Sequence, residues 1–161
     1  MLASKNVVVH CWSPADWRRV AGEYAIVSRH SEPRTPWRAE GWTPVGGSRI
    51  DVDASVCREA ERFAHASRSI RSATPAAADA VRVIAHEAIH TAGEADEATT
   101  ECTALQSVAN AARGLGATPA VARALARLAW IEYGSEPPPY RTAECRNGGR
   151  LDLRPGESVW P

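Results

Sequence analysis

Apolar and polar residues alternate with a helical period through the second half of the chain. Three such stretches, at about 75–92, 96–113 and 118–133, open with a capping residue or an early proline, and Gly134 follows the last one. A shorter amphipathic stretch runs to Ser67, and either Asp53 or Ser55 can cap its start. These patterns predict four helices, three of them in close succession.

The first third of the chain has the character of short strands and loops. Residues 6–12 are rich in β-branched side chains and predict a strand, and Pro14 opens a helix to about Tyr24. Residues 28–48 hold several Pro and Gly and predict a loop with at most a brief strand, with Trp37 and Trp42 covering the core. Residues 49–52 predict a second strand, which we place at the sheet edge, where it either binds an extended peptide or only connects two elements.

The last segment, residues 135–161, is rich in Pro and Gly and predicts an irregular tail with a short strand at 151–153. The chain of 161 residues contains no internal repeat and fits one domain. We expect a mostly helical α+β fold with three parts: a strand, helix and Trp-rich loop layer at 1–53, a helical core at 54–134 and the tail at 135–161.

The most specific motif is the pentapeptide at 86–90, which contains His86, Glu87 and His90. Imidazoles four positions apart lie on one face of a helix, so both rings can bind one tetrahedral Zn²⁺. A carboxylate directly after the first histidine lies close enough to accept a proton from water at the metal. The motif lies in the last two turns of the helix predicted at 75–92.

This H-E-x-x-H sequence resembles the zincin metallopeptidases, and the stretch at 75–113 resembles minimal gluzincins and uncharacterised bacterial metallopeptidase-like proteins. The resemblance implies a zinc-dependent hydrolase of peptide bonds. Zn²⁺ would be its cofactor, His86 and His90 would be ligands, and Glu87 would be the general base. The HExxH helix would be followed by an antiparallel helix that carries a ligand glutamate.

Three carboxylates compete for the third ligand position. Asp96 fits an extended metzincin-like spacing, but the only Met is Met1, so the methionine turn of that group is missing, and Asp96 also suits a helix N-cap. Glu97 and Glu101 are the gluzincin alternatives. If the helices are antiparallel, Glu101 lies about 7.5 Å below the turn, level with the motif, and Ala104 allows close packing. We favour Glu101, keep Glu97 and Asp96 as alternatives, and expect the other Glu to hydrogen-bond a ligand imidazole.

The four cysteines are widely spaced and contain no CxxC pair, so they predict disulfides rather than a zinc finger. Of the three possible pairings we favour Cys11–Cys57 and Cys102–Cys145. Disulfides indicate an extracytoplasmic or secreted protein, whereas four free thiols would indicate the cytoplasm. Residues 1–6 are too short and polar for a signal peptide, although a leader could have been removed.

Charge and composition restrict the partners. The formal net charge is zero, which disfavours nucleic-acid binding, and no stretch is apolar enough to span a membrane. The resemblance implies a peptide or protein substrate, with Tyr140 or Tyr133 as a possible oxyanion stabiliser, unless these residues only hold the tail. The alternatives are an amidase for a non-protein or cell-wall peptide, and a non-catalytic module that binds zinc or a partner.

Overall fold

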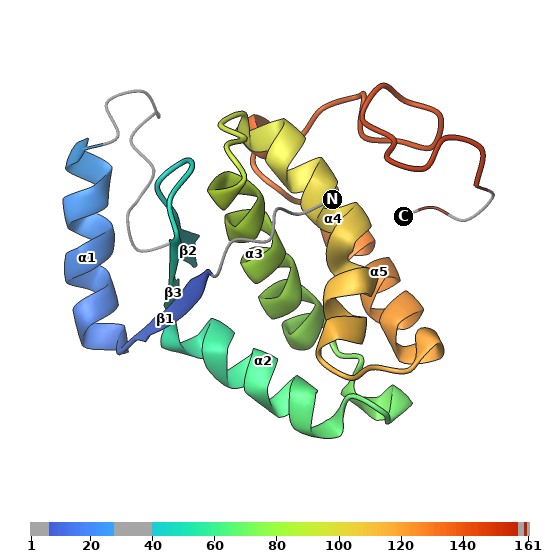
Figure 1. Ribbon diagram of the computed structural model, residues 1–161, viewed down its shortest axis with the longest axis horizontal. Helices are drawn as coiled ribbons and strands as arrows, with labels where there is room; N and C mark the ends of the chain where they lie inside the picture. The colour runs from blue at the N-terminus through green and yellow to red at the C-terminus, as the bar shows by residue number, and fades with distance from the viewer. Residues whose placement is uncertain (1–6, 28–39, 158–159, 161) are drawn as a thin grey trace.

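The computed structural model describes residues 7–27, 40–157 and 160. In this part of the chain a small sheet lies at one side of a set of helices, and the C-terminal segment crosses the helices at their upper end (Figure 1). The elements in chain order are β1 (Val8–Trp12), α1 (Pro14–Val27), β2 (Gly41–Trp42), β3 (Arg49–Asp53), α2 (Ala54–Ala66), η2 (Ile70–Ser72), α3 (Pro75–Thr91), α4 (Glu97–Gly114), α5 (Pro119–Tyr133) and η3 (Pro138–Tyr140). The fold is mostly helical α+β, as the sequence predicts.

The sheet has the order β1-β3-β2, with β1 parallel and β2 antiparallel to β3. The prediction that residues 49–52 form an edge strand is therefore wrong, because β3 is central. The short β2 is the edge strand next to α3. Trp42 lies on β2 and packs with Trp17 and Val20 of α1, whereas Trp37 lies outside the described residues.

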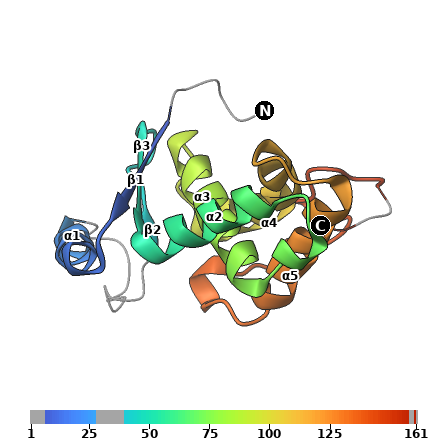
Figure 2. The same ribbon diagram turned by 90° about the horizontal axis from the view of Figure 1, so that it is seen from below.

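Both faces of β3 are covered, which is why it forms the centre of the sheet. Ile50 and Val52 are buried against α2 and α3, in a cluster that includes Val56. On the other face, the buried Asp51 accepts a hydrogen bond from Trp12 Nε1 at 2.9 Å. Figure 2 shows the sheet between α1 on one side and the remaining helices on the other.

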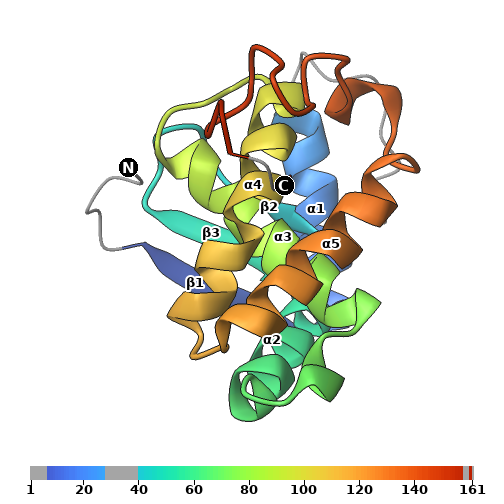
Figure 3. The ribbon, with the colours of Figure 1, turned by 90° about the vertical axis from the view of Figure 1, so that its right-hand side faces the viewer.

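Side-chain caps set the start of each long helix. The side chains of Thr74, Asp96 and Thr118 accept hydrogen bonds from backbone N–H groups in the first turns of α3, α4 and α5. The turn between α3 and α4 contains Gly93 at φ +104°, a conformation that favours glycine. α3 and α4 therefore form a tight antiparallel hairpin, and α5 packs beside α4 (Figure 3). Among the described helices none is long and apolar enough to cross a membrane.

Two disulfides tie the ends of the chain to this helical centre. Cys11–Cys57 joins β1 to α2, and Cys102–Cys145 joins α4 to the C-terminal segment, so the predicted pairing is confirmed. Disulfides of this kind indicate an oxidising, extracytoplasmic environment. Gln106 also holds the C-terminal segment, since it donates to the Leu151 carbonyl and accepts from the Leu153 N–H, both at 2.8 Å. Residues 151–153 form turns there, so the predicted short strand is wrong.

Candidate metal centre

The two histidines of the pentapeptide lie on one face of α3 and are both buried. α3 forms because its sequence is rich in alanine, begins at a threonine cap and carries proline in the first turn. Four residues of helix bring the His86 and His90 rings together, with their Nε2 atoms 3.1 Å apart. The two imidazoles thus offer two nitrogen ligands to one position.

Glu97, in the first turn of α4, completes this group. Its Oε2 lies 3.2 Å from His86 Nε2 and 3.6 Å from His90 Nε2. Tetrahedral zinc with bonds of about 2.0–2.1 Å holds its ligand atoms about 3.3 Å apart. The three separations fall close to that value, so the donor set fits a zinc ion in both chemistry and spacing. Within the described part of the chain, His86, His90 and Glu97 thus form a group that could hold a metal ion.

The second nitrogen of each ring has its own acceptor. His86 Nδ1 lies 2.8 Å from Glu101 Oε2, and His90 Nδ1 lies 2.7 Å from the Glu94 carbonyl oxygen. When each Nδ1–H donates to these oxygens, the lone pair of each Nε2 is available for a cation. The hairpin therefore sets both the orientation and the tautomer of the two rings.

Glu101 is fully buried but faces the wrong side of His86 to share an ion with His90. One of its oxygens contacts His86 Nδ1, and the other accepts a hydrogen bond from Arg82 at 2.9 Å. α3 ends one residue after His90, so the first turn of α4 lies level with the Nε2 atoms and Glu101 lies one turn deeper. This geometry favours Glu97 over the Glu101 expected from sequence, and it gives Glu101 the supporting role expected of the other Glu.

Asp96, the third candidate, accepts a hydrogen bond from the Thr99 N–H at 2.8 Å and caps α4. Its carboxylate is thus directed at the helix N-terminus rather than at the two rings. The metzincin-like spacing in the sequence arises from this cap.

Carboxylates on α3 and α4 surround the two rings and attract positive charge to them. Burial alone would lower the pKa of His86, but hydrogen bonds to Glu101 and Glu97 outweigh it and raise that pKa to about 9. The pKa of Glu97 is lowered because its hydrogen bonds to the two histidines outweigh its burial. The carboxylates thus stabilise positive charge at the position between the rings, as a site for a divalent cation requires.

Glu87 lies on the same turn of α3 but points towards the sheet. Burial raises the pKa of its carboxyl, against the opposing charges of His86 and His90. None of the residues that the structure describes donates a hydrogen bond to its Oε2, although that atom is buried. Gly41 of β2 borders it closely, since a Cβ built there would lie 2.8 Å from both Cγ and Oε1 of Glu87. The edge strand thus confines a carboxylate with an unused acceptor beside the two rings.

Arg82 is a supporting residue that the sequence analysis did not single out. It lies one turn before His86, is buried, and pairs with Glu101, Asp79 and Glu136 at 2.9, 2.6 and 3.3 Å. An arginine on the inner face of an otherwise apolar helix was the available signal, because a buried guanidinium needs carboxylate partners. Gly41 gave no such signal, because its role depends on the placement of β2.

The two tyrosines differ in position. The ring centroids of Tyr140, in η3, and His86 lie 5.7 Å apart, so the C-terminal segment brings Tyr140 to the edge of the site. The Tyr133 hydroxyl accepts a hydrogen bond from the Thr142 N–H at 2.9 Å and holds that segment. Of the two candidates, Tyr140 is therefore the one beside the rings.

Comparison with known proteins gives no family assignment. No protein-family model matches the chain, and no curated protein or solved structure is significantly similar to it. What can be stated of its function therefore comes from the site itself: a buried group of two histidines and one glutamate that could hold a metal ion, in a geometry that resembles that of the zincins.

Proposed function

We propose that the chain is a zinc-dependent hydrolase of peptide bonds, with His86, His90 and Glu97 as the metal ligands and Glu87 as the general base. The observation that carries the proposal is the convergence of two Nε2 atoms and one carboxylate oxygen at spacings of 3.1, 3.2 and 3.6 Å. Three protein ligands leave one tetrahedral position for water or substrate, which is the arrangement of catalytic rather than structural zinc.

Glu87 supports a catalytic over a structural role for the metal. A structural zinc site needs no base, and burying a carboxylate with a free acceptor costs stability. When bound, Zn²⁺ would supply Lewis acidity that activates water and polarises a substrate carbonyl. Glu87 Oε2 would then accept a proton and later deliver it to the leaving nitrogen. The raised pKa of Glu87 suits this proton transfer, because a general base works best when its pKa lies nearer to the working pH.

The supporting residues orient these groups. Glu101 holds His86 through Nδ1, and Arg82 holds Glu101 from the other side. The edge strand β2 lies next to Glu87, so an extended peptide paired with β2 would pass close to the site. Tyr140, whose ring lies beside that of His86, would contact the substrate or the developing oxyanion. This arrangement favours a peptide substrate over other amides.

Metal analysis combined with a peptide-library assay tests the proposal. The purified protein, dialysed against zinc, should retain about one ion per chain and cleave members of a mixed peptide library, with products read by mass spectrometry. Glu87→Gln should keep the zinc and lose cleavage, whereas the exposed Glu132→Gln on α5 should behave as the parent. Cleavage by Glu87→Gln at the parental rate would show that Glu87 is not the base.

The third ligand is tested by zinc affinity. Loss of an outer hydrogen-bond partner of a ligand histidine lowers metal affinity about 10–100-fold, and we expect Glu101→Gln to fall in that range. Glu97→Gln removes a ligand oxygen and should weaken binding further. If the two variants rank in the opposite order in a competition titration with a chromogenic chelator, Glu101 is the ligand.

A further inference from the structure

Several arginines gather near the end of the helical hairpin that lies away from the candidate metal centre. The stretches 62–78 and 102–131 contain six arginines and neither aspartate nor glutamate. In the fold, the parts of these stretches at the end of α2, in η2 and in the turn between α4 and α5 meet at the lower end of Figure 1. The candidate metal centre and its carboxylates lie at the upper end. The end away from the candidate metal centre is thus rich in arginine, although Glu59 of α2 lies beside it and pairs with Arg62.

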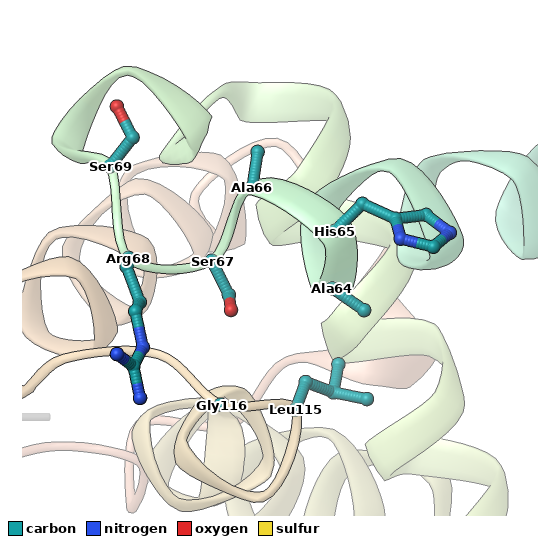
Figure 4. Close-up of a pocket in the computed structure, with 8 residues that line it drawn as sticks. All are labelled: Ala64, His65, Ala66, Ser67, Arg68, Ser69, Leu115 and Gly116. Carbon is teal, nitrogen blue, oxygen red and sulfur yellow. The ribbon is translucent and has the colours of Figure 1, made fainter.

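Two exposed turns carry three of these arginines and lie on either side of an open pocket of about 480 Å³. One turn is 68–71, with the sequence Arg-Ser-Ile-Arg, and the other is 113–116, with the sequence Arg-Gly-Leu-Gly. Figure 4 shows Arg68 and Ser67 directed from the first turn towards Leu115 and Gly116 of the second. The two turns therefore lie next to each other, and the arginines of both are exposed.

Each turn also exposes one large aliphatic side chain. Ile70 is 59% exposed and Leu115 is 38% exposed. Isolated exposed apolar residues are common on protein surfaces. Here, however, each of the two neighbouring turns exposes one of them: Ile70 next to Arg71, and Leu115 between two glycines. We call the set Arg68, Ile70, Arg71, Arg113 and Leu115 the basic corner.

We propose that the basic corner docks on the surface of an anionic phospholipid bilayer. Its three arginines match lipid phosphates in charge and geometry, and Ile70 and Leu115 would enter the boundary between headgroups and acyl chains. A soluble polyanion would satisfy the arginines but would leave the two aliphatic side chains in water. The combination of charge and exposed apolar tips therefore favours a bilayer.

Docking in this way sets the direction of the candidate metal centre. α3 has 17 residues and spans about 24 Å from the basic corner to the turn before α4. The metal centre would thus face away from the bilayer, towards material outside it. The docking does not depend on the proposed hydrolysis, since it uses none of the same residues.

Vesicle co-sedimentation of the full chain tests the proposal. The protein should bind vesicles of equal parts phosphatidylcholine and phosphatidylglycerol, less strongly as salt increases, and should not bind pure phosphatidylcholine. Each arginine near an anionic surface is worth about a fivefold change in partitioning, so replacing Arg68, Arg71 and Arg113 by Gln should weaken binding about a hundredfold.

A matched control changes the same net charge elsewhere. Arg18, Arg146 and Arg150 are exposed on α1 and the C-terminal segment, and their replacement by Gln should weaken binding far less. Circular dichroism should show both triple variants folded, because none of these arginines is buried. Equal loss in both variants would overturn the proposal, as would failure of the folded parent to bind anionic vesicles.

The aliphatic residues separate a bilayer from a soluble polyanion. Ile70→Ser with Leu115→Ser leaves the charge unchanged and should reduce vesicle binding while leaving retention on a heparin column unaltered. If this variant binds vesicles as well as the parent does, the surface recognises polyanions by charge alone and the bilayer assignment is wrong.

Discussion

Gly41→Ala is the sharpest single test of the site, because it adds one methyl group where β2 meets Glu87. The new Cβ would lie 2.8 Å from Cγ and Oε1 of Glu87, whereas ordinary contacts begin at 3.4 Å. Gly41 does not adopt a positive φ, so the backbone accepts alanine and the effect is steric alone. The glutamate must therefore retreat by about 0.6 Å, the difference between these distances.

The expected consequence is a loss of turnover without a loss of metal. A misplacement of about 1 Å in a catalytic group can cost about 10²-fold in rate, so we expect kcat of Gly41→Ala to fall by roughly that factor. Overpacking should also cost about 1–3 kcal/mol in the free energy of unfolding. Zinc content should be unchanged, because the three atoms that a Cβ at Gly41 would meet first all belong to Glu87 and none to a proposed ligand.

A second glycine supplies the control. A Cβ at Gly114, at the end of α4, would meet nothing within 4 Å, so Gly114→Ala should retain activity and gain up to about 1 kcal/mol in stability. Steady-state kinetics on a peptide cleaved by the parent, with urea unfolding in parallel, measures both effects. Parental kcat in Gly41→Ala would refute the reasoning, because Glu87 would then have room that the geometry denies it.

Three further predictions concern stability and pH. Arg82→Met removes the arginine partner of the buried Glu101 carboxylate and should lower the free energy of unfolding in urea by about 3–5 kcal/mol. Adding Glu101→Gln should recover part of this loss, whereas additive losses would argue against the pairing. Replacing Cys102 and Cys145 by Ser removes a link between α4 and the C-terminal segment and should cost about 2–5 kcal/mol in thermal unfolding, whereas unchanged stability would contradict a structural role for this link. Burial, and next the charge of Asp79, raises the pKa of Glu40 from 4.5 to about 7. Between these pH values the unfolded state binds fewer protons than the folded state, so the free energy of unfolding should fall as pH rises. Glu40→Gln should make the free energy of unfolding less dependent on pH in this range.

The helices could be predicted from sequence because their signals are local. The threonine, aspartate and proline residues at the helix starts, together with the spacing of apolar residues, placed α3, α4 and α5 within about two residues of their observed bounds. The choice of disulfide partners also succeeded, since each pair joins an irregular end to the helical centre. Neither inference required knowledge of the sheet.

The order of the sheet could not be predicted in this way. Placing β3 in the centre depends on β1 and β2 pairing with it from segments that are distant or very short. A run of two residues such as Gly41–Trp42 carries no strand signal of its own. The role of Gly41 beside Glu87 was hidden for the same reason.

The proposed third ligand shows how a small geometric difference favours one of two neighbouring carboxylates. Spacing along the helix predicts a metal level with the middle of the motif, five residues below the turn, and therefore favours Glu101. In the structure the Nε2 atoms of the rings point towards the top of the hairpin, and the first turn of α4 faces them. The expected distance along the helix was reasonable, but the direction of the rings was not available from spacing alone.

The proposed ligands and the strand that confines Glu87 belong to different parts of the fold, so metal binding and turnover should be separable. The proposed ligands all belong to the α3–α4 hairpin, whereas the confinement of Glu87 depends on β2 and thus on the sheet. Cys11–Cys57 ties β1 to α2 and holds that sheet in place. Replacing Cys11 and Cys57 by Ser should therefore lower kcat while the zinc dissociation constant stays at the parental value. The opposite pattern, in which zinc affinity falls and the metal-saturated protein keeps its kcat, would mean that the sheet supports the ligands rather than the base.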